Sequence, residues 1–123
     1  LEMNQILLQI STRDFSFVAE HHLSDIFKKF ADVRVKVNMM QNSAISFSAC
    51  ITNQADKVDR LLASLRDQFK VDADDDLELL TIRHYNDSIL HELKRNRIII
   101  LEEKLSDTVQ MITKRVPQLK MKA

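Results

Sequence analysis

Residues 6–73, from ILLQIST (6–12) to DQFKVDA (67–73), decide the fold of this chain. Apolar residues that alternate with polar ones predict strands at 6–10, 33–40, 45–51 and 69–73. Apolar spacings of three and four residues predict two helices, one carrying Leu23, Ile26, Phe27 and Phe30 and the other Val58, Leu61, Leu62, Leu65 and Phe69. The order strand-helix-strand-strand-helix-strand predicts an α+β, ferredoxin-like βαββαβ domain, with both helices on one face of its sheet.

The composition restricts the classes of function that this chain can have. The chain has 123 residues, of which 45% are hydrophobic, enough for a real core. Its 18 basic residues balance 18 acidic ones, so no strong field attracts nucleic acid or an anionic membrane. A single cysteine, the absence of an export signal and the absence of a long apolar run favour a reducing cytoplasm and no membrane partner.

The sequence contains no glycine. Phosphate-binding loops of nucleotide-using enzymes need glycine because their backbone amides approach the phosphate closely. No spaced pair of catalytic or metal-ligating groups stands out either. His21, His22 and Asp25 have poor spacing for a metal site. We therefore expect no catalytic residues, no metal and no cofactor in this chain.

The strand pattern restarts after a predicted acidic turn at Asp74–Asp76. Residues 77–82 alternate as a strand, Asn86 is placed to cap a short helix, and residues 98–101 read as a strand covered on both faces. A further strand is predicted at 108–113. The sequence thus predicts a first domain at 4–75, a second, incomplete βαββ unit at 76–115, and a tail at 116–123.

Three further expectations concern the ends of elements. Asn53 is a plausible cap for the second helix. Pro117 and the basic residues Lys114, Arg115, Lys120 and Lys122 look like a frayed end. The incomplete second unit leaves a sheet edge that needs a partner strand. Leu1-Glu2-Met3 is an unusual natural start, so we also expect this sequence to be part of a longer protein.

The block VKVNMMQNSAISFSACI (35–51), with ILLQIST before it, resembles the first regulatory ACT domain of bacterial aspartate kinases. The run from Leu79 to Ile112, including LLTIRHY (79–85), resembles the second ACT domain of the same enzymes. In that family the first ACT domain is inserted into the second, and a strand of the second precedes the first. This chain begins too late to hold that strand, which would explain the incomplete repeat.

The resemblance implies a regulatory role without catalysis. Such domains bind an end-product amino acid, lysine or threonine, and thereby inhibit a separate kinase domain that phosphorylates aspartate. They act as homodimers with the effector at the interface. Carried over position by position, the effector site comprises Ser16, Ala19, His21, His22, Leu23, Val37, Asn38, Ser43 and Ala44.

The sequence departs from that family at residues of the expected site. His21 stands where the family often has glycine, and Asn38 and Ala44 stand where lysine-binding members often carry carboxylates. Asp14, Glu20 or Asp25 could supply a carboxylate instead, so the identity of the effector stays open. The alternative function is a ferredoxin-like RNA-binding or protein-interaction module. The neutral charge and the single strand aromatic Phe47 disfavour RNA.

Overall fold

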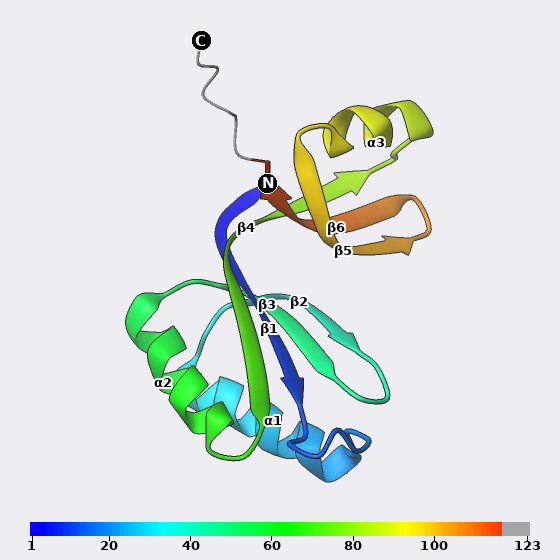
Figure 1. Cartoon of the computed structure of the whole chain (residues 1–123). Helices are drawn as coiled ribbons and strands as arrows, with labels where there is room; N and C mark the ends of the chain where they lie inside the picture. The colour runs from blue at the N-terminus through cyan, green and yellow to red at the C-terminus, as the bar shows by residue number, and fades with distance from the viewer. Residues whose placement is uncertain (117–123) are drawn as a thin grey trace. The chain divides into compact units, whose positions relative to one another are not determined.

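The computed structural model describes residues 1–116 and contains strands and helices in the order β1-α1-β2-β3-α2-β4-α3-β5-β6 (Figure 1). The chain divides into two compact units. The first unit is Asn4–Asp75, and the second unit joins Leu1–Met3 to the described residues from Asp76 onward. The bounds are β1 Glu2–Ser11, α1 Glu20–Val33, β2 Val37–Asn42, β3 Phe47–Thr52, α2 Ala55–Arg66, β4 Lys70–Arg83, α3 Asp87–Lys94, β5 Arg97–Leu105 and β6 Thr108–Arg115.

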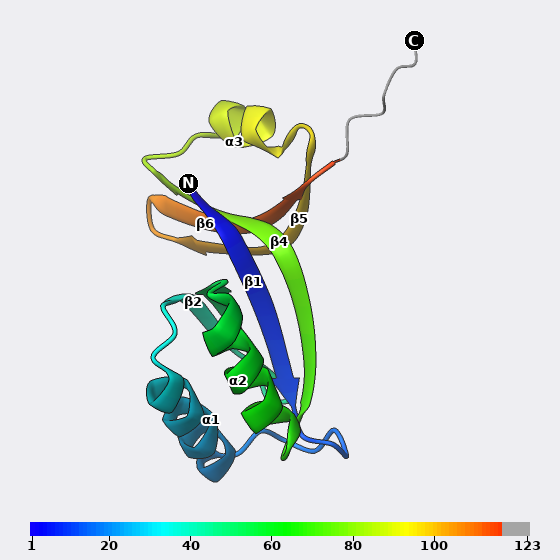
Figure 2. The same cartoon turned by 90° about the vertical axis from the view of Figure 1, so that its left-hand side faces the viewer.

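The first unit has the predicted ferredoxin-like topology. Its strands are ordered β2-β3-β1-β4, with β3 antiparallel to both β1 and β2. Helices α1 and α2 cover one face of this sheet (Figure 2). The α+β fold expected from the order of the elements is confirmed.

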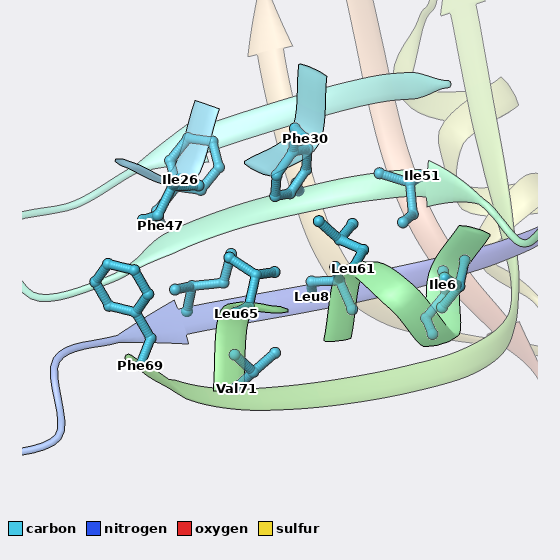
Figure 3. Packing of buried hydrophobic residues seen from close by; sticks show 13 residues of the cluster. Ile6, Leu8, Ile26, Phe30, Phe47, Ile51, Leu61, Leu65, Phe69 and Val71 are labelled. Carbon is cyan, nitrogen blue, oxygen red and sulfur yellow. The ribbon is translucent and has the colours of Figure 1, made fainter. Parts of the chain in front are cut away.

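The core of the first unit lies between the two helices and the sheet. Ile26 of α1 and Leu61 and Leu65 of α2 are all 0% exposed, because the helical periods of both sequences point one apolar stripe inward. They meet alternate residues of the strands (Figure 3). The sheet contributes Ile6, Leu8, Ile10, Phe47, Ala49, Ile51 and Val71.

The second unit is smaller and holds one helix. The second half of β4 pairs with β6, and β6 pairs with β5, which ends the sheet. Helix α3 packs over this sheet through Leu90, which lies against Leu80, Val109 and Met111. The unit therefore has the predicted βαββ order, and in the part of the chain that the structure describes, the buried cluster under α3 comprises Leu80, Leu90, Val109 and Met111.

Several predicted boundaries were wrong. Val33 and Val35 were assigned to a strand, but α1 continues to Val33 and ends where Arg34 turns left-handed at φ 61°. Both valines still pack against the core of the first unit. Ile45 was also placed in a strand, whereas β3 begins at Phe47 and Ile45 is 56% exposed. Alternation alone did not show where the turns fall.

Two predictions near α2 also need correction. Gln54, not Asn53, precedes the first residue of α2. The Asn53 backbone is engaged with Asn4 instead, accepting from its Nδ2 at 3.1 Å and donating to its carbonyl at 2.9 Å. Phe69 lies beyond α2, in the turn before β4, and is buried at 3% exposure.

The acidic run is not a turn. Asp74, Asp75 and Asp76 lie inside β4, a single strand of 14 residues that serves both units. The charges do not interrupt it because Asp75 and Asp76 are exposed to water and Asp74 is half-buried. The predicted strands before and after the run are thus one strand, bent at Asp76, where φ is 58°.

The remaining corrections concern β5 and β6. The apolar run of β5 was expected to be covered on both faces, but Ile98 is 48% and Ile100 36% exposed, whereas Ile99 packs against the core of the second unit, so only one face of this run is covered. Lys114 and Arg115 are part of β6 rather than a frayed end. Arg115 Nε donates to both carboxylate oxygens of Glu78, at 3.2 and 3.1 Å. Residues 117–123 of the predicted tail, which include Pro117, Lys120 and Lys122, lie outside the described part of the chain.

Glu78 is the one acidic residue among the buried polar groups of the described chain, at 4% exposure. Besides Arg115, its carboxylate faces Arg97, whose Nε lies 3.8 Å away. Arg97 also donates through Nη1 to the Leu93 carbonyl at the end of α3, at 2.9 Å. Two guanidinium groups thus compensate one buried carboxylate and tie β4, β5 and β6 together. Within residues 1–116, no helix is long and apolar enough to cross a membrane.

Candidate functional site

A concavity of about 680 Å³ opens at the start of α1 in the first unit. The loop before α1, the first turn of the helix and the last residue of β2 form its walls. Its lining residues are Val18, Ala19, Glu20, His21, Leu23 and Asn42. A space of this size and polarity suits a small ligand.

The helix start in this concavity has no side-chain cap. Ala19 occupies the N-cap position and offers no oxygen to the first helical amides. The first intrahelical bond runs from the Leu23 amide to the Ala19 carbonyl at 3.1 Å. The amides of Glu20, His21 and His22 precede it, so this end presents orphan N–H donors and the positive end of the helix dipole. Such a site favours an anion such as a carboxylate.

His22 secures the bend that leads into the helix. Its Nδ1 accepts a hydrogen bond from the Ala19 amide at 2.9 Å, which requires this nitrogen to be unprotonated. Its ring lies against that of His21, with centroids 3.9 Å apart and the planes tilted by 41°, and meets Phe69 edge-on at 6.0 Å. The backbone of Ala19 is therefore fixed by a side chain one turn later, while the following amides stay open.

The loop before α1 is ordered by short polar contacts. Asp14 Oδ1 accepts from the Ser16 amide at 3.1 Å, and Thr12 Oγ1 donates to the Ser16 carbonyl at 3.0 Å. The Ser16 hydroxyl, followed by the Ser16 amide and the Thr12 hydroxyl, lowers the pKa of the Asp14 carboxyl below its usual 3.8. Val18 then donates to the Ala44 carbonyl at 2.8 Å, which ties this loop to the turn after β2.

The structure brings together only part of the predicted effector site. Ala19, His21 and Leu23 line the concavity, and His22 supports it from the next turn. Ala44 borders it through its bond to Val18. Ser16 and Ser43 lie in the two adjoining loops, where their hydroxyls bond locally, Ser16 with Thr12 and Ser43 with Ser46.

Val37 and Asn38 lie at the opposite end of β2 from Asn42, which lines the concavity. Val37 packs against the core of the first unit. Asn38 Nδ2 donates to Gln5 Oε1 at 2.8 Å and to Thr52 Oγ1 at 3.0 Å. Cys50, which is fully buried, donates to the same Gln5 oxygen at 3.2 Å. Asn38 therefore belongs to a polar cluster inside the sheet of the first unit.

Of the carboxylates considered as substitutes, Glu20 lines the concavity. Asp14 is engaged in its own loop, and Asp25 accepts from Gln68 Nε2 at 3.0 Å. Sequence reasoning missed Val18 and Asn42 as lining residues. The position of Asn42, at the boundary between an alternating strand and a polar turn, was a signal that could have identified it.

Comparisons with known proteins identify the fold. No family profile matches the sequence, and no curated protein matches it. Several solved structures match the fold of the chain. A domain assigned as the C-terminal regulatory domain of aspartate kinase from Porphyromonas gingivalis is 16% identical, with a TM-score of 0.73, over 90% of this chain and 81% of that one. The aspartate kinase of Clostridium acetobutylicum is 12% identical with a TM-score of 0.72, over 94% of this chain and 30% of that one.

Escherichia coli aspartokinase III, in complex with lysine and aspartate, is 16% identical with a TM-score of 0.68. The match covers 94% of this chain but only 28% of that enzyme. This chain therefore has the fold of aspartate kinase regulatory domains, as the sequence resemblance predicted, and spans under a third of the full-length enzymes that it matches.

Proposed function

We propose that this chain is the regulatory ACT pair of an aspartate kinase and binds an end-product amino acid, lysine or threonine. The observation that carries the proposal is the open, uncapped start of α1 at a concavity lined by Glu20 and Asn42. The fold shared with aspartate kinase regulatory domains supports it. So does the lysine held by aspartokinase III from E. coli, one of the structures that this chain resembles.

The two charged ends of an amino acid match two features of the concavity. The α-carboxylate would accept hydrogen bonds from the amides of Glu20 and His21 at the helix start. The Glu20 carboxylate and the Asn42 side-chain oxygen would accept from an ammonium group. Lysine carries two ammonium groups and threonine one, so the role of Glu20 separates the two candidates.

The wider setting is part of the same proposal. A kinase domain outside these residues would phosphorylate aspartate in the cytoplasm, and the effector would inhibit it through a homodimer of the regulatory units. Binding can shift the enzyme toward an inhibited state only as far as the effector prefers that state. This chain would therefore contribute binding and coupling, with no catalytic residue of its own.

The test is a calorimetric titration with lysine and threonine of the parent chain, Glu20→Gln and Asp87→Asn. Asp87 is the matched control because it is the first residue of α3, as Glu20 is of α1. Losing one charged hydrogen bond of about 1.5–3 kcal/mol weakens binding by roughly tenfold to a hundredfold. We expect this loss in Glu20→Gln and unchanged affinity in Asp87→Asn.

The pattern of losses also identifies the effector. A loss for lysine alone would show that Glu20 holds the lysine side chain, whereas an equal loss for both would place the α-ammonium there. A thermal-shift screen checks the same point, because a ligand at a hundredfold excess over its Kd adds about 2.7 kcal/mol. If neither amino acid binds or shifts the parent chain, the proposal is wrong.

A further inference from the structure

The turn between α2 and β4 lies beside the candidate site of the first unit without lining it. Helix α2 ends at Arg66 and β4 begins at Lys70. The amides of Gln68 and Phe69 both donate to the Leu65 carbonyl, at 3.1 and 2.8 Å, which closes the turn tightly. In the part of the chain that the structure describes, the lining of the concavity comes from the loop before α1, α1 and β2, and not from this turn.

The loop before α1 is fastened to the turn by a guanidinium group. Arg13 Nη2 donates to the carbonyl oxygens of Arg66 and Asp67, at 2.7 and 2.9 Å. Carbonyl groups at a helix C-terminus lack intrahelical partners and form the negative end of the helix dipole, so a cation that donates to them is favourable. Arg13 therefore satisfies acceptors at the end of α2 and ties the loop to a point 53 residues away in the sequence.

A second contact holds a strained residue of the same loop. Phe15 has φ 59°, a left-handed conformation that is unfavourable for a bulky side chain. Its amide donates to the Thr12 carbonyl at 3.1 Å, and the Lys70 ammonium lies over its ring, 5.0 Å from the centroid. Phe15 is 60% exposed, so burial does not explain the conformation. Strain of this kind persists where surrounding contacts fix the backbone, here from within the loop and from the start of β4.

Two further contacts reach the first turns of α1. Phe69, which is buried in the core of the first unit (Figure 3), meets the ring of His22 edge-on at 6.0 Å. Gln68 Nε2 donates to Asp25 Oδ2 at 3.0 Å. His22 in turn accepts from the Ala19 amide at 2.9 Å. The side chain that shapes the helix start is thus itself braced by the turn.

These four contacts fall on both sides of the open amides. Arg13 and Phe15 precede Ala19 in the chain, whereas His22 and Asp25 follow it. The stretch between them contributes most of the residues that line the concavity, and one short turn holds it at both ends. Such bracing sets the spacing and direction of the donors before a ligand arrives, and a site binds more tightly when its donors are preorganised.

We propose that the turn between α2 and β4 positions the donors of the effector site, with Arg13 and Gln68 as positioning residues. They act through the loop and the helix start rather than by touching the effector. This role rests on the proposed function, because it concerns the shape of the same site. Coupling between two sites is reciprocal, so a ligand that uses the amides at the start of α1 also stabilises the turn.

The first test needs no ligand and compares amide exchange, measured by NMR, in the parent chain, Arg13→Ala and Lys57→Ala. Lys57 is the matched control because its Nζ donates to the Arg34 carbonyl at the end of α1, at 3.2 Å, within the same unit. The amides of Ala19 and Leu23 are hydrogen-bonded in the parent chain. We expect both to exchange faster with solvent in Arg13→Ala and to keep their rates in Lys57→Ala.

The second test is a calorimetric titration of the same chains with lysine and with threonine. Affinity for the amino acid that binds the parent chain should fall by about fivefold in Arg13→Ala, as for the loss of one ordinary hydrogen bond, and stay unchanged in Lys57→Ala. Arg13→Lys, which keeps the charge but loses the planar fork of donors, should lose part of the affinity. In the parent chain, the bound amino acid should slow the exchange of the Gln68 and Phe69 amides.

Equal affinities in the two alanine variants, or unchanged exchange at the start of α1 in Arg13→Ala, would overturn the positioning role while leaving the proposed function intact. If neither amino acid binds the parent chain, the proposed function is wrong, and the ligand-free comparison decides the role of the turn. Faster exchange confined to Arg13→Ala would then still support it, and equal exchange in Lys57→Ala would overturn it.

Discussion

The starts of α1 and α3 occupy the same place in their two units, after the first strand of a βαββ order, yet they differ chemically. Asn86 caps α3, its side chain accepting from the Ile89 amide at 2.8 Å. The loop before α3 is closed as well, because His84 Nδ1 lies 2.7 Å from Asp107 Oδ2. At α1, Ala19 leaves the first amides open beside a concavity.

If the proposed function is right, this difference lets one order of elements serve two purposes. A capped helix start satisfies its own donors and stabilises the fold, whereas an open one keeps donors for a ligand. Within the described chain, the unit with the open start also has the larger buried cluster beneath its helices. Under the proposed function, binding belongs to the first unit, and the following predictions test that division.

The largest expected effect concerns the unequal cores. Leu61→Ala in the first unit should lower the free energy of unfolding by about 4 kcal/mol, because the side chain is fully buried between helix and sheet. Leu90→Ala in the second unit should lower it by about 2 kcal/mol, since the described buried cluster that contains Leu90 is smaller. Urea unfolding of both variants measures the difference, and equal losses would contradict the unequal cores.

The next effect is on binding. Ala19→Asp should place a carboxylate on the open amides of α1, where it competes with an effector carboxylate. We expect affinity to fall by roughly tenfold or more while stability rises by about 1 kcal/mol. Calorimetry and thermal unfolding measure the two quantities on the same sample. Retained affinity in a stabilised variant would show that the ligand does not use these amides.

The reciprocal change removes the cap that α3 has. Asn86→Ala should cost about 1 kcal/mol of stability, because the Ile89 amide loses its acceptor. Amino-acid affinity should remain that of the parent chain, since the lost cap lies in the second unit. A weakened affinity in this variant would mean that the second helix start also binds.

The C-terminal ends of the same helices give a smaller contrast. Arg34 ends α1 in a left-handed conformation with φ 61°, whereas Arg95 ends α3 with φ −67°. Arg34→Gly should therefore raise stability by about 0.5 kcal/mol by relieving backbone strain, and Arg95→Gly should lower it. Thermal unfolding distinguishes the two variants. A rise in stability in both, or a fall in both, would be inconsistent with this geometry.

The smallest effect is a pH dependence of the loop before α1. Because folding lowers the pKa of Asp14, its carboxylate contributes stability above the usual value of 3.8 and loses it as the pH falls through the lowered pKa. The stability difference between the parent chain and Asp14→Asn should thus shrink on acidification. Unfolding curves from about pH 6 to about pH 3 measure it, and a difference independent of pH would argue against the loop contacts.

Much of the fold could be predicted because the spacing of apolar residues and the order of the strands and helices were clear. The helical stripe of Ile26 and Phe30 and the alternation around Phe47 and Ala49 both place the core correctly. Asn86 was identified as a cap because asparagine before a helical stripe has a direct physical role. Local alternation could not reveal that the acidic segment at Asp74–Asp76 runs through one strand.

The candidate site was harder to predict, because its main feature is a helix start that lacks a capping side chain. An alanine at a helix start carries no signal in the sequence, and Asn42 joins Ala19 only through the fold. Asn38 was a reasonable polar candidate by position, but its amide is engaged with Gln5 and Thr52. Which polar residues remain available to a ligand is decided by tertiary hydrogen bonding, which periodicity does not report.

The most direct measurement of the central claim is a titration of the isotope-labelled chain with lysine and with threonine, followed by backbone amide NMR. The account predicts that one of the two shifts the amides of Glu20, His21 and His22 at the open start of α1. The amides of Asp87, Ser88 and Ile89 at the capped start of α3 should stay in place. Shifts confined to α3, or no shift at either helix start with either amino acid, would contradict the account.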